Sequence, residues 1–373
     1  DDCEPLAHEI CLNTVGGYWC ECRETRQWGT TDDDVAYAVA MDGSGNVLVT
    51  GDTYAGLDGN LNLGSQDAVL TRWNADGTKA WTRQWGSNES DQGYGVAIDP
   101  SGNIVVGGMT YGSLGDPNQG YEDLFVTKRN ADGNEIWTRQ KGSSGADYGF
   151  AVAVDGSGNA FVTGLTRGFV DGQSYQGNED VILVKWDTDG NWAWTRVWGT
   201  QNYDTGHGVA VNSAGEVFVA GRTGGAMGLG SNAGGDDVFL SKFGTDGTLL
   251  WTKQLGSTAW DYGASVSVDG AGNIYVAGYT NGNLDGNGSR GGQDVFLARW
   301  NPDGTLAWVR QWGTTTMDQA ESVTVTTYGD VFVTGWTYGS MDGNRARGGM
   351  DVFLTRWNAD GVTSDGAFST EAL

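Results

Sequence analysis

The chain has 373 residues, of which 63 are glycine and 4 are proline; this argues against a helical bundle, because a glycine inside a helix costs about 1 kcal/mol relative to alanine. The 17 Trp, 14 Tyr and 11 Phe residues supply enough apolar surface for a packed core. With 21 basic and 47 acidic side chains the formal net charge is −26, which excludes nucleic acids and anionic lipid surfaces as general partners.

The N-terminal segment, residues 1–24, is set apart by its cysteines. All four cysteines of the chain lie there, at positions 3, 11, 20 and 22. This distribution predicts a small disulfide-stapled module from an oxidising compartment, and four cysteines allow three connectivities. No apolar run approaches the roughly 20 residues of a membrane span, and the first ten residues lack the basic and apolar regions of a signal peptide. We therefore expect a soluble or already processed chain without membrane insertion.

Residues 11–22, C-L-N-T-V-G-G-Y-W-C-E-C, resemble the C-x-N-x4-Y-x-C-x-C core of calcium-binding EGF-like domains. That family has six cysteines, and the four present here correspond to its second through fifth. The resemblance implies two disulfides, Cys3–Cys20 and Cys11–Cys22, and places Asn13 near a calcium site. The alternative is a truncated disulfide module without calcium that serves for contacts.

The rest of the chain, residues 25–361, is repetitive. A W-G-S/T tripeptide, with Lys or Leu replacing Trp in two copies, begins at positions 28, 85, 141, 198, 255 and 312, so the period is about 57 residues. Each unit contains four short runs rich in Val, Phe, Thr and Trp, bounded by turn residues. In the first unit these runs are Val39–Asp42, Val47–Thr50, Asp67–Trp73 and Ala80–Trp85. Six repeats of four antiparallel strands predict an all-β fold, a six-bladed β-propeller.

The two ends of the repeat region predict how the ring closes. The last unit stops at Gly361 without a W-T-R-Q-W-G segment, and the missing strand occurs at residues 25–28, before the first unit. We expect this N-terminal strand to complete the last blade, so that no sheet edge stays exposed. Residues 362–373 form a polar C-terminal tail.

The repeat, with its strings V-A-V-D-x-S-G-N-V-x-V-T-G and G-x-D-V-F-L-x-R-W-N-x-D-G, is similar to the SBBP type of bacterial β-propeller repeat over residues 25–361. The resemblance is specific for the fold. It implies secreted or surface bacterial proteins of mostly undefined activity, and propellers in general host both enzymes and binding proteins.

Two aspartate series recur in every blade. One opens the third strand of each unit, and the other lies six residues after the W-G-S/T position, at Asp34, Asp91, Asp147, Asp204, Asp261 and Asp318. Carboxylates are suited to Ca²⁺, so the second series is the candidate metal site together with Asn13. The competing interpretation is structural: each Asp accepts backbone N–H bonds where the chain crosses between blades. Strict repetition favours the structural role, since a functional site usually breaks symmetry.

Ligand contacts are expected from aromatic residues that stand outside the repeat positions, because the in-register tryptophans belong to the core. These ligand candidates are Tyr175, Trp192, Trp260 and Trp336. The chain has only two histidines, His8 and His207, and no nucleophile elbow, H-E-x-x-H motif or phosphate-binding loop. The sequence therefore predicts no catalytic residues.

The function predicted from these features is that of a secreted, non-catalytic structural protein, localised outside the cell or on its surface. It assembles with copies of itself, head to tail, into a filament or surface array through the N-terminal module or the tail. The alternative is a calcium-assisted propeller that binds extracellular glycans or matrix. The third possibility is a polysaccharide hydrolase that uses paired carboxylates.

Overall fold

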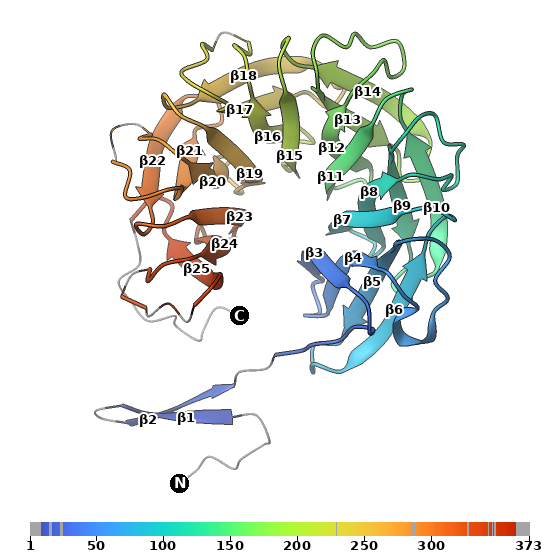
Figure 1. The fold of residues 1–373 in the computed structure, drawn as a ribbon, viewed down its shortest axis with the longest axis horizontal. Helices are drawn as coiled ribbons and strands as arrows, with labels where there is room; N and C mark the ends of the chain where they lie inside the picture. Colours follow the sequence, from blue (N-terminus) through green and yellow to red (C-terminus); the bar gives the residue numbers. More distant parts are fainter. Residues whose placement is uncertain are drawn as a thin grey trace.

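The computed structural model describes residues 9–14, 17–22 and 25–362, except 229, 285, 287, 327, 342, 345 and 347, with side chains described from residue 25 onward. The described part is a ring of β-sheets, and a single 3-10 turn, η1 (Leu57–Gly59), lies in the loop between the second and third strands of the first sheet (Figure 1). None of the helical structure in this part is long and apolar enough to cross a membrane.

Six antiparallel sheets, the blades, follow one another around the ring, as the 57-residue repeat predicts. The first three blades are β3 (Asp34–Met41), β4 (Val47–Thr53), β5 (Asp67–Trp73), β6 (Lys79–Trp85); β7 (Asp91–Ile98), β8 (Ile104–Thr110), β9 (Asp123–Arg129), β10 (Glu135–Lys141); and β11 (Asp147–Val154), β12 (Ala160–Thr166), β13 (Asp180–Trp186), β14 (Trp192–Trp198). The last three are β15 (Asp204–Val211), β16 (Val217–Thr223), β17 (Asp237–Phe243), β18 (Leu249–Leu255); β19 (Asp261–Val268), β20 (Ile274–Thr280), β21 (Asp294–Trp300), β22 (Leu306–Trp312); and β23 (Asp318–Val325), β24 (Val331–Thr337), β25 (Asp351–Trp357).

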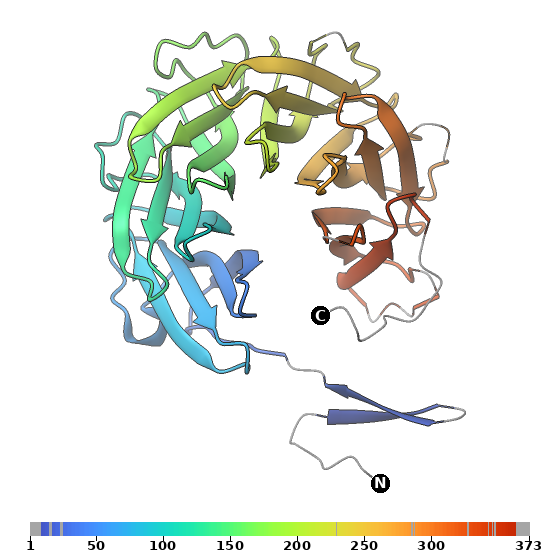
Figure 2. The same ribbon diagram turned by 180° about the vertical axis from the view of Figure 1, so that it is seen from behind.

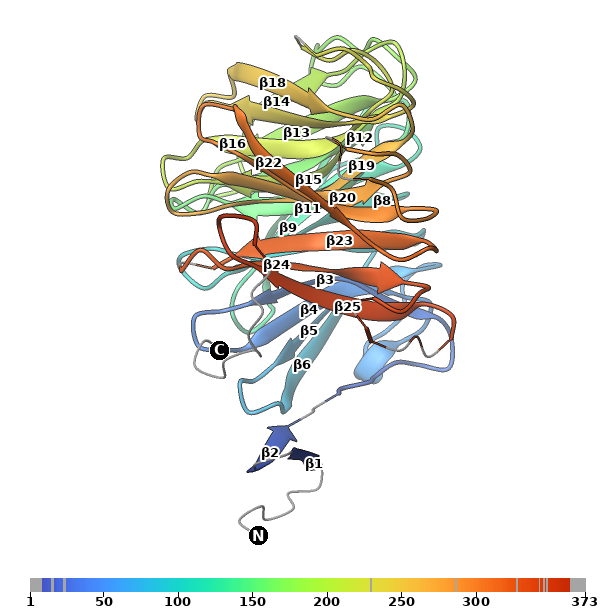
Figure 3. The ribbon, with the colours of Figure 1, turned by 90° about the vertical axis from the view of Figure 1, so that its left-hand side faces the viewer.

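The first strand of each blade lies next to the centre of the ring, and the fourth lies on its circumference (Figures 1 and 2). Seen from the side, the strands run across the thickness of the ring, so that the turns gather on its two faces (Figure 3). The third strands are almost continuously buried, because neighbouring blades cover both of their faces. The D-G-S-G-N segments are tight turns, in which Asp42 accepts the N–H groups of Ser44 and Asn46 at 2.9 Å each and Gly45 supplies a φ of 81°.

Each outer strand is tied to the blade that follows it. In the second blade, Arg139 Nε donates a 2.7 Å hydrogen bond to the carbonyl of Gly190 in the next blade. Gly190 has a φ of 80° and packs on the ring of Trp137, so that a Cβ there would lie 2.7 Å from the indole. A second tie is Lys128 of the second blade, whose Nζ donates to the Thr188 hydroxyl of the third blade at 2.9 Å while it forms a buried ion pair with Asp99 of its own blade at 2.8 Å. These contacts fix blade against blade.

The predicted closure of the ring is not found in the described residues. The sixth sheet has three strands, in the order β23-β24-β25, and residues 25–33 form no strand. The ring is open between the first and sixth blades (Figures 1 and 2). Residues 25–28 lie on the first blade, where the ring centroid of Trp28 is 5.2 Å from that of Trp73, but they do not pair with the outer edge of β25.

At the N-terminus, β1 (Glu9–Thr14) and β2 (Gly17–Cys22) form an antiparallel hairpin. Its register sets Cys11 opposite Cys20, whereas the EGF-like resemblance pairs Cys11 with Cys22. The side chains of this hairpin, Cys3 and the tail beyond residue 362 lie outside the described residues. The EGF-like module, its disulfides and the calcium role of Asn13 therefore stay predictions.

Candidate functional site

The repeated aspartates have structural partners in every blade. Asp91 is fully buried and accepts the backbone N–H of Ser87 at 2.6 Å and its hydroxyl at 3.0 Å. The carboxylate of Asp67, which opens β5, accepts the Leu63 N–H at 2.8 Å and the Gln84 amide at 2.9 Å. The same bond to the backbone N–H four residues earlier recurs in the second series at Asp34, Asp147, Asp204, Asp261 and Asp318. These carboxylates hold the crossing between blades.

The glycine of the W-G-S/T motif lies between one carboxylate of each aspartate series and leaves room for both. A Cβ on Gly86 would lie 2.4 Å from an oxygen of Asp67 and 2.8 Å from one of Asp91, so only glycine fits between them. No group of three or more His, Cys, Asp or Glu side chains that could hold a metal ion occurs in the described part of the chain. The calcium prediction for the series that begins at Asp34 gains no support from this geometry and stays a prediction.

One inner-strand position breaks the sixfold symmetry. Each inner strand has a register shift against its neighbour after its third residue, for example between Gly93 and Gly95 of β7, which makes the fourth residue a β-bulge. Bulges turn a side chain away from the regular pleat and are common beside functional sites. The residue at this bulge differs around the ring: Tyr37, Tyr94, Phe150, His207, Ala264 and Glu321.

The first four bulge residues form a row of aromatic rings across four blades. The centroids are 4.9 Å apart for Tyr37 and Tyr94, 5.6 Å for Tyr94 and Phe150, and 5.4 Å for Phe150 and His207. The row continues to Tyr262 in the fifth blade, whose ring centroid is 4.4 Å from that of His207. These contacts lie in the range of favourable aromatic pairs. We call these five residues the inner aromatic row.

His207 is the polar centre of the inner aromatic row. Its Nδ1 lies 3.1 Å from the Tyr262 hydroxyl, while its Nε2 is buried and has no hydrogen-bond partner in the described part of the protein. Burial, with a smaller contribution from the charge of Arg222, lowers the pKa of His207 to about 3. The imidazole is therefore neutral at physiological pH. Burial also raises the pKa of Tyr262, so its hydroxyl stays protonated.

Acidic and basic side chains border the inner aromatic row. Glu179, which is buried, pairs with Arg167 at 2.5 Å and lies 3.9 Å from Arg222. Arg222 also pairs with Asp236 at 2.7 Å. One blade earlier, the Tyr148 hydroxyl donates to Glu122 at 2.7 Å. Each of these three carboxylates, Glu122, Glu179 and Asp236, therefore has a hydrogen-bond donor or a cationic partner.

The second departure from symmetry is the exposed sheet of the sixth blade. Val352 and Leu354 of β25 are 85% and 55% exposed. The residues at the same two positions in the first five blades are fully buried, at Ala68, Leu70, Leu124, Val126, Val181, Leu183, Val238, Leu240, Val295 and Leu297. The sixth blade therefore presents an apolar strand whose counterparts are all covered.

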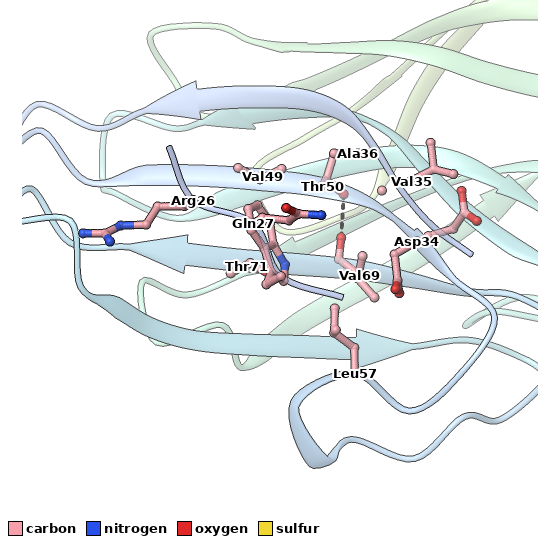
Figure 4. A pocket seen from close by; sticks show the side chains of 13 residues that line it. Arg26, Gln27, Asp34, Val35, Ala36, Val49, Thr50, Leu57, Val69 and Thr71 are labelled. Atoms are coloured by element: carbon pink, nitrogen blue, oxygen red, sulfur yellow. Dashed lines mark hydrogen bonds between the residues drawn. The ribbon is translucent and has the colours of Figure 1, made fainter. Parts of the chain in front are cut away.

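The first blade, at the other end of the series of six blades, is exposed as well. Val39 and Met41 of β3 are both 66% exposed. A cavity of about 170 Å³ lies between residues 26–28 and the sheet. Val49 and Val69 are among the residues that line it (Figure 4). We refer to these surfaces of the first and sixth blades as the two open ends.

The four predicted ligand residues do not form one site. Trp192 and Trp260 are exposed, on an outer strand and on a loop respectively. Tyr175 lies in a loop of the third blade and donates its hydroxyl to the Asn178 carbonyl. Trp336 is the closest of them to a bulge residue, since its Nε1 donates to Glu321 at 3.0 Å. The ligand roles of these four residues stay predictions.

The inner aromatic row was missed because its members occupy a repeat position. The useful signal was the fourth residue of the D-x-G-x-x-V pattern, which varies among Tyr, Phe, His, Ala and Glu while its neighbours repeat. The open ends gave no local signal, because the sequences of β3 and β25 resemble those of the buried strands.

Comparison with known proteins agrees with this fold. Residues 80–115, 136–168 and 250–285 match the SBBP family model, described as a β-propeller repeat. The regulatory protein FlaEY of Caulobacter vibrioides is 25% identical over 362 residues, covering 84% of this chain and 38% of FlaEY. An uncharacterised WD repeat-containing protein, L264, of Acanthamoeba polyphaga mimivirus is 21% identical over 321 residues, covering 62% of this chain and 23% of L264. The chain thus spans less than half the length of either relative.

Three solved structures align with most of the chain at low sequence identity. The β-propeller domain of the Trilobed protease from Pyrococcus furiosus, described as having an open velcro topology, has a TM-score of 0.46, 11% identity, and coverage of 88% of this chain and 82% of its own. The polysaccharide lyase Uly1 has a TM-score of 0.44, 10% identity, and coverage of 92% and 83%. A gluconolactonase from Xanthomonas campestris has a TM-score of 0.41, 14% identity, and coverage of 83% and 95%. The observed blades form a six-bladed β-propeller, and three segments of it match the model of the SBBP repeat.

Proposed function

We propose that the protein is a non-catalytic structural protein that assembles head to tail with copies of itself outside the cell. The observation that carries this proposal is the pair of open ends: the sixth blade exposes Val352 and Leu354, and the first blade exposes Val39 and Met41. Exposed apolar surface of this kind on a long sheet edge favours association with another chain.

The two open ends are complementary halves of one packing arrangement. Where the first and second blades meet, the buried core consists of Leu48, Ala68, Leu70 and Trp85 on one side and Ile104, Val106 and Phe125 on the other. The repeat places Phe332, Val352 and Leu354 of the sixth blade at the positions of the first set. It places Val47, Val49 and Val69 of the first blade at the positions of the second set. Contact between the sixth blade of one copy and the first blade of the next would build this core again.

The extracellular location is supported by the cysteine distribution, since four cysteines within 22 residues are typical of oxidising compartments. The non-catalytic role is supported by the inner aromatic row, in which His207 pairs with a protonated tyrosine and the bordering carboxylates pair with donors. A head-to-tail contact uses two different surfaces, so it propagates into a filament or array unless the geometry closes it.

The test is the assembly state of the full chain as a function of concentration, measured by light scattering and negative-stain imaging. We expect Leu354→Lys to abolish assembly, because a charge on a sheet edge blocks pairing. Leu249→Lys is the matched control, since Leu249 is 45% exposed on β18 of the fourth blade. A wild-type chain that stays monomeric at every concentration would refute the proposal, as would equal effects of the two substitutions.

A second candidate function, binding of extracellular glycans with or without calcium, is favoured by the inner aromatic row. Aromatic faces bordered by paired carboxylates and guanidinium groups are surfaces on which sugar rings stack and hydrogen-bond. We expect a glycan array to report binding that Tyr94→Ala abolishes and that Tyr121→Ala, at an exposed loop tyrosine, leaves unchanged. Calorimetry with Ca²⁺ tests the calcium component separately, and absence of both signals removes this candidate.

A further inference from the structure

The outer edge of β25 is the unused strand position of the ring. In the first five blades a fourth strand pairs with the third, and in the sixth no described residue does so. In the first blade that fourth strand contains the sequence T-R-Q-W at residues 82–85, with Trp85 opposite Ala68 and Arg83 opposite Leu70. The corresponding pairs in the fifth blade are Trp312 with Val295 and Arg310 with Leu297. The repeat therefore defines both the sequence and the register that fit this edge.

Residues 25–28 have the same sequence, T-R-Q-W, and already adopt half of the contacts of a fourth strand. Trp28 packs on Trp73 of the first blade at 5.2 Å, just as Trp312 of the fifth blade packs on Trp357 of the sixth at 4.9 Å. An outer strand normally contacts the following blade in this way while it pairs with its own sheet. Residues 25–28 make this contact with the following blade, but they do not pair with a third strand.

We propose that residues 25–28 of one copy pair with β25 of a second copy and complete its sixth blade. The repeat register sets Trp28 opposite Val352 and Arg26 opposite Leu354. Gln27 then faces Phe353 and approaches Asp351, as Gln84 donates to Asp67 in the first blade. This inference rests on the proposed head-to-tail assembly and names the strand that mediates it. Addition of an extended segment to a free sheet edge is a recurring mode of recognition.

The second copy is the occupant that the geometry favours. Residues 25–28 stand on the first blade, which lies across the opening of the ring from β25 (Figure 1). Pairing within one chain requires the whole ring to close, whereas pairing between chains requires no change in either ring. It also covers Val352 and Leu354 of one copy with the first blade of the next, so that both open ends are buried in a single contact.

The test is disulfide trapping between two differently tagged full-length variants. A chain with Arg26→Cys is mixed with a chain that carries Leu354→Cys and is oxidised mildly with oxidised glutathione. Directly opposite residues on antiparallel strands have Cα atoms about 4.5–5.5 Å apart, within disulfide range. Arg356→Cys is the register control, because a position two residues away is about 7–8 Å distant and should give about tenfold less product. Each single variant alone reports mispairing with the four native cysteines.

The expected result is a heterodimer that carries both tags from the Arg26→Cys and Leu354→Cys mixture, with little product from the Arg356→Cys mixture. If wild-type chains assemble but the in-register mixture gives no heterodimer, the strand assignment is wrong and the proposed function survives. If one chain that carries both Arg26→Cys and Leu354→Cys cross-links only within itself, the ring closes on itself and the inference is overturned. If wild-type chains do not assemble, both proposals fail together.

Discussion

Protonation of His207 should cost the folded protein stability as the pH falls, and the substitution His207→Phe should remove that cost. Phenylalanine fits the position because Phe150 occupies the same bulge in the third blade. It keeps the ring contacts on both sides but cannot take up a proton. The Tyr262 hydroxyl, 3.1 Å from Nδ1, loses its partner, which costs about 1 kcal/mol at every pH.

The magnitude follows from the two pKa values. His207 has a pKa of about 3 in the folded state, and an unfolded histidine has a pKa of about 6.5. Because the folded pKa is the lower one, the contribution to stability is complete above about pH 6.5 and is lost as the pH falls toward the folded value. At pH 5 the loss is about 2 kcal/mol, since one pKa unit corresponds to about 1.4 kcal/mol.

The assay is denaturant unfolding followed by tryptophan fluorescence for both chains at pH 7.5, 6 and 5. The free energy of unfolding of the wild type, relative to His207→Phe, should fall by about 2 kcal/mol between pH 7.5 and pH 5. A difference that stays constant within about 0.5 kcal/mol would show that the folded protein accepts the proton freely, and the assignment of a buried neutral imidazole would be refuted.

Three other substitutions test the blade contacts by the same unfolding assay. Gly190→Ala should lose about 2–4 kcal/mol, because alanine is strained at a φ of 80° and its Cβ meets an indole, whereas Gly156→Ala, in open space, should change stability by less than about 0.5 kcal/mol. Lys128→Met should lose about 3–5 kcal/mol by leaving the buried Asp99 unpaired, and adding Asp99→Asn should restore about 2 kcal/mol; additive losses would contradict this. Burial raises the pKa of Asp147 to about 6, so its carboxyl favours folding most below its unfolded pKa and loses that contribution as the pH rises through about 6. Asp147→Asn should therefore flatten this part of the pH profile, and an unchanged slope would show that the carboxyl titrates normally.

The blades were predictable because each is a local pattern. Third strands such as Asp123–Arg129 combine an apolar run with turn residues at both ends, and sixfold repetition removes the ambiguity of any single copy. The inner strands are longer than predicted, since β3 begins at Asp34 rather than Val39, because the bulge interrupts the alternation that marks a strand.

The open ring and the inner aromatic row could not be predicted from local sequence patterns. Pairing of residues 25–28 with β25 depends on where the two ends of a long row of blades come to lie, which no local pattern records. The apolar ring of Trp28 packs on Trp73 of the first blade. This contact forms whether or not residues 25–28 pair with β25, so the sequence does not distinguish the two arrangements. The inner aromatic row depends on a bulge, which places Tyr94 and His207 along one line although 113 positions separate them.

The net charge of −26 sets a condition on the proposed assembly. Two chains of this charge repel one another over about 30 Å at 0.01 M salt, but over only about 3 Å at 1 M, whereas the apolar contact between the open ends is not weakened by salt. Assembly should therefore increase with ionic strength, and light scattering at a fixed protein concentration measures it. The scattering of Leu354→Lys, which lacks the apolar contact, should stay flat over the same range. If assembly instead weakened as salt increased, attraction between opposite charges would be holding the copies together, and the apolar open ends would not be the contact surface.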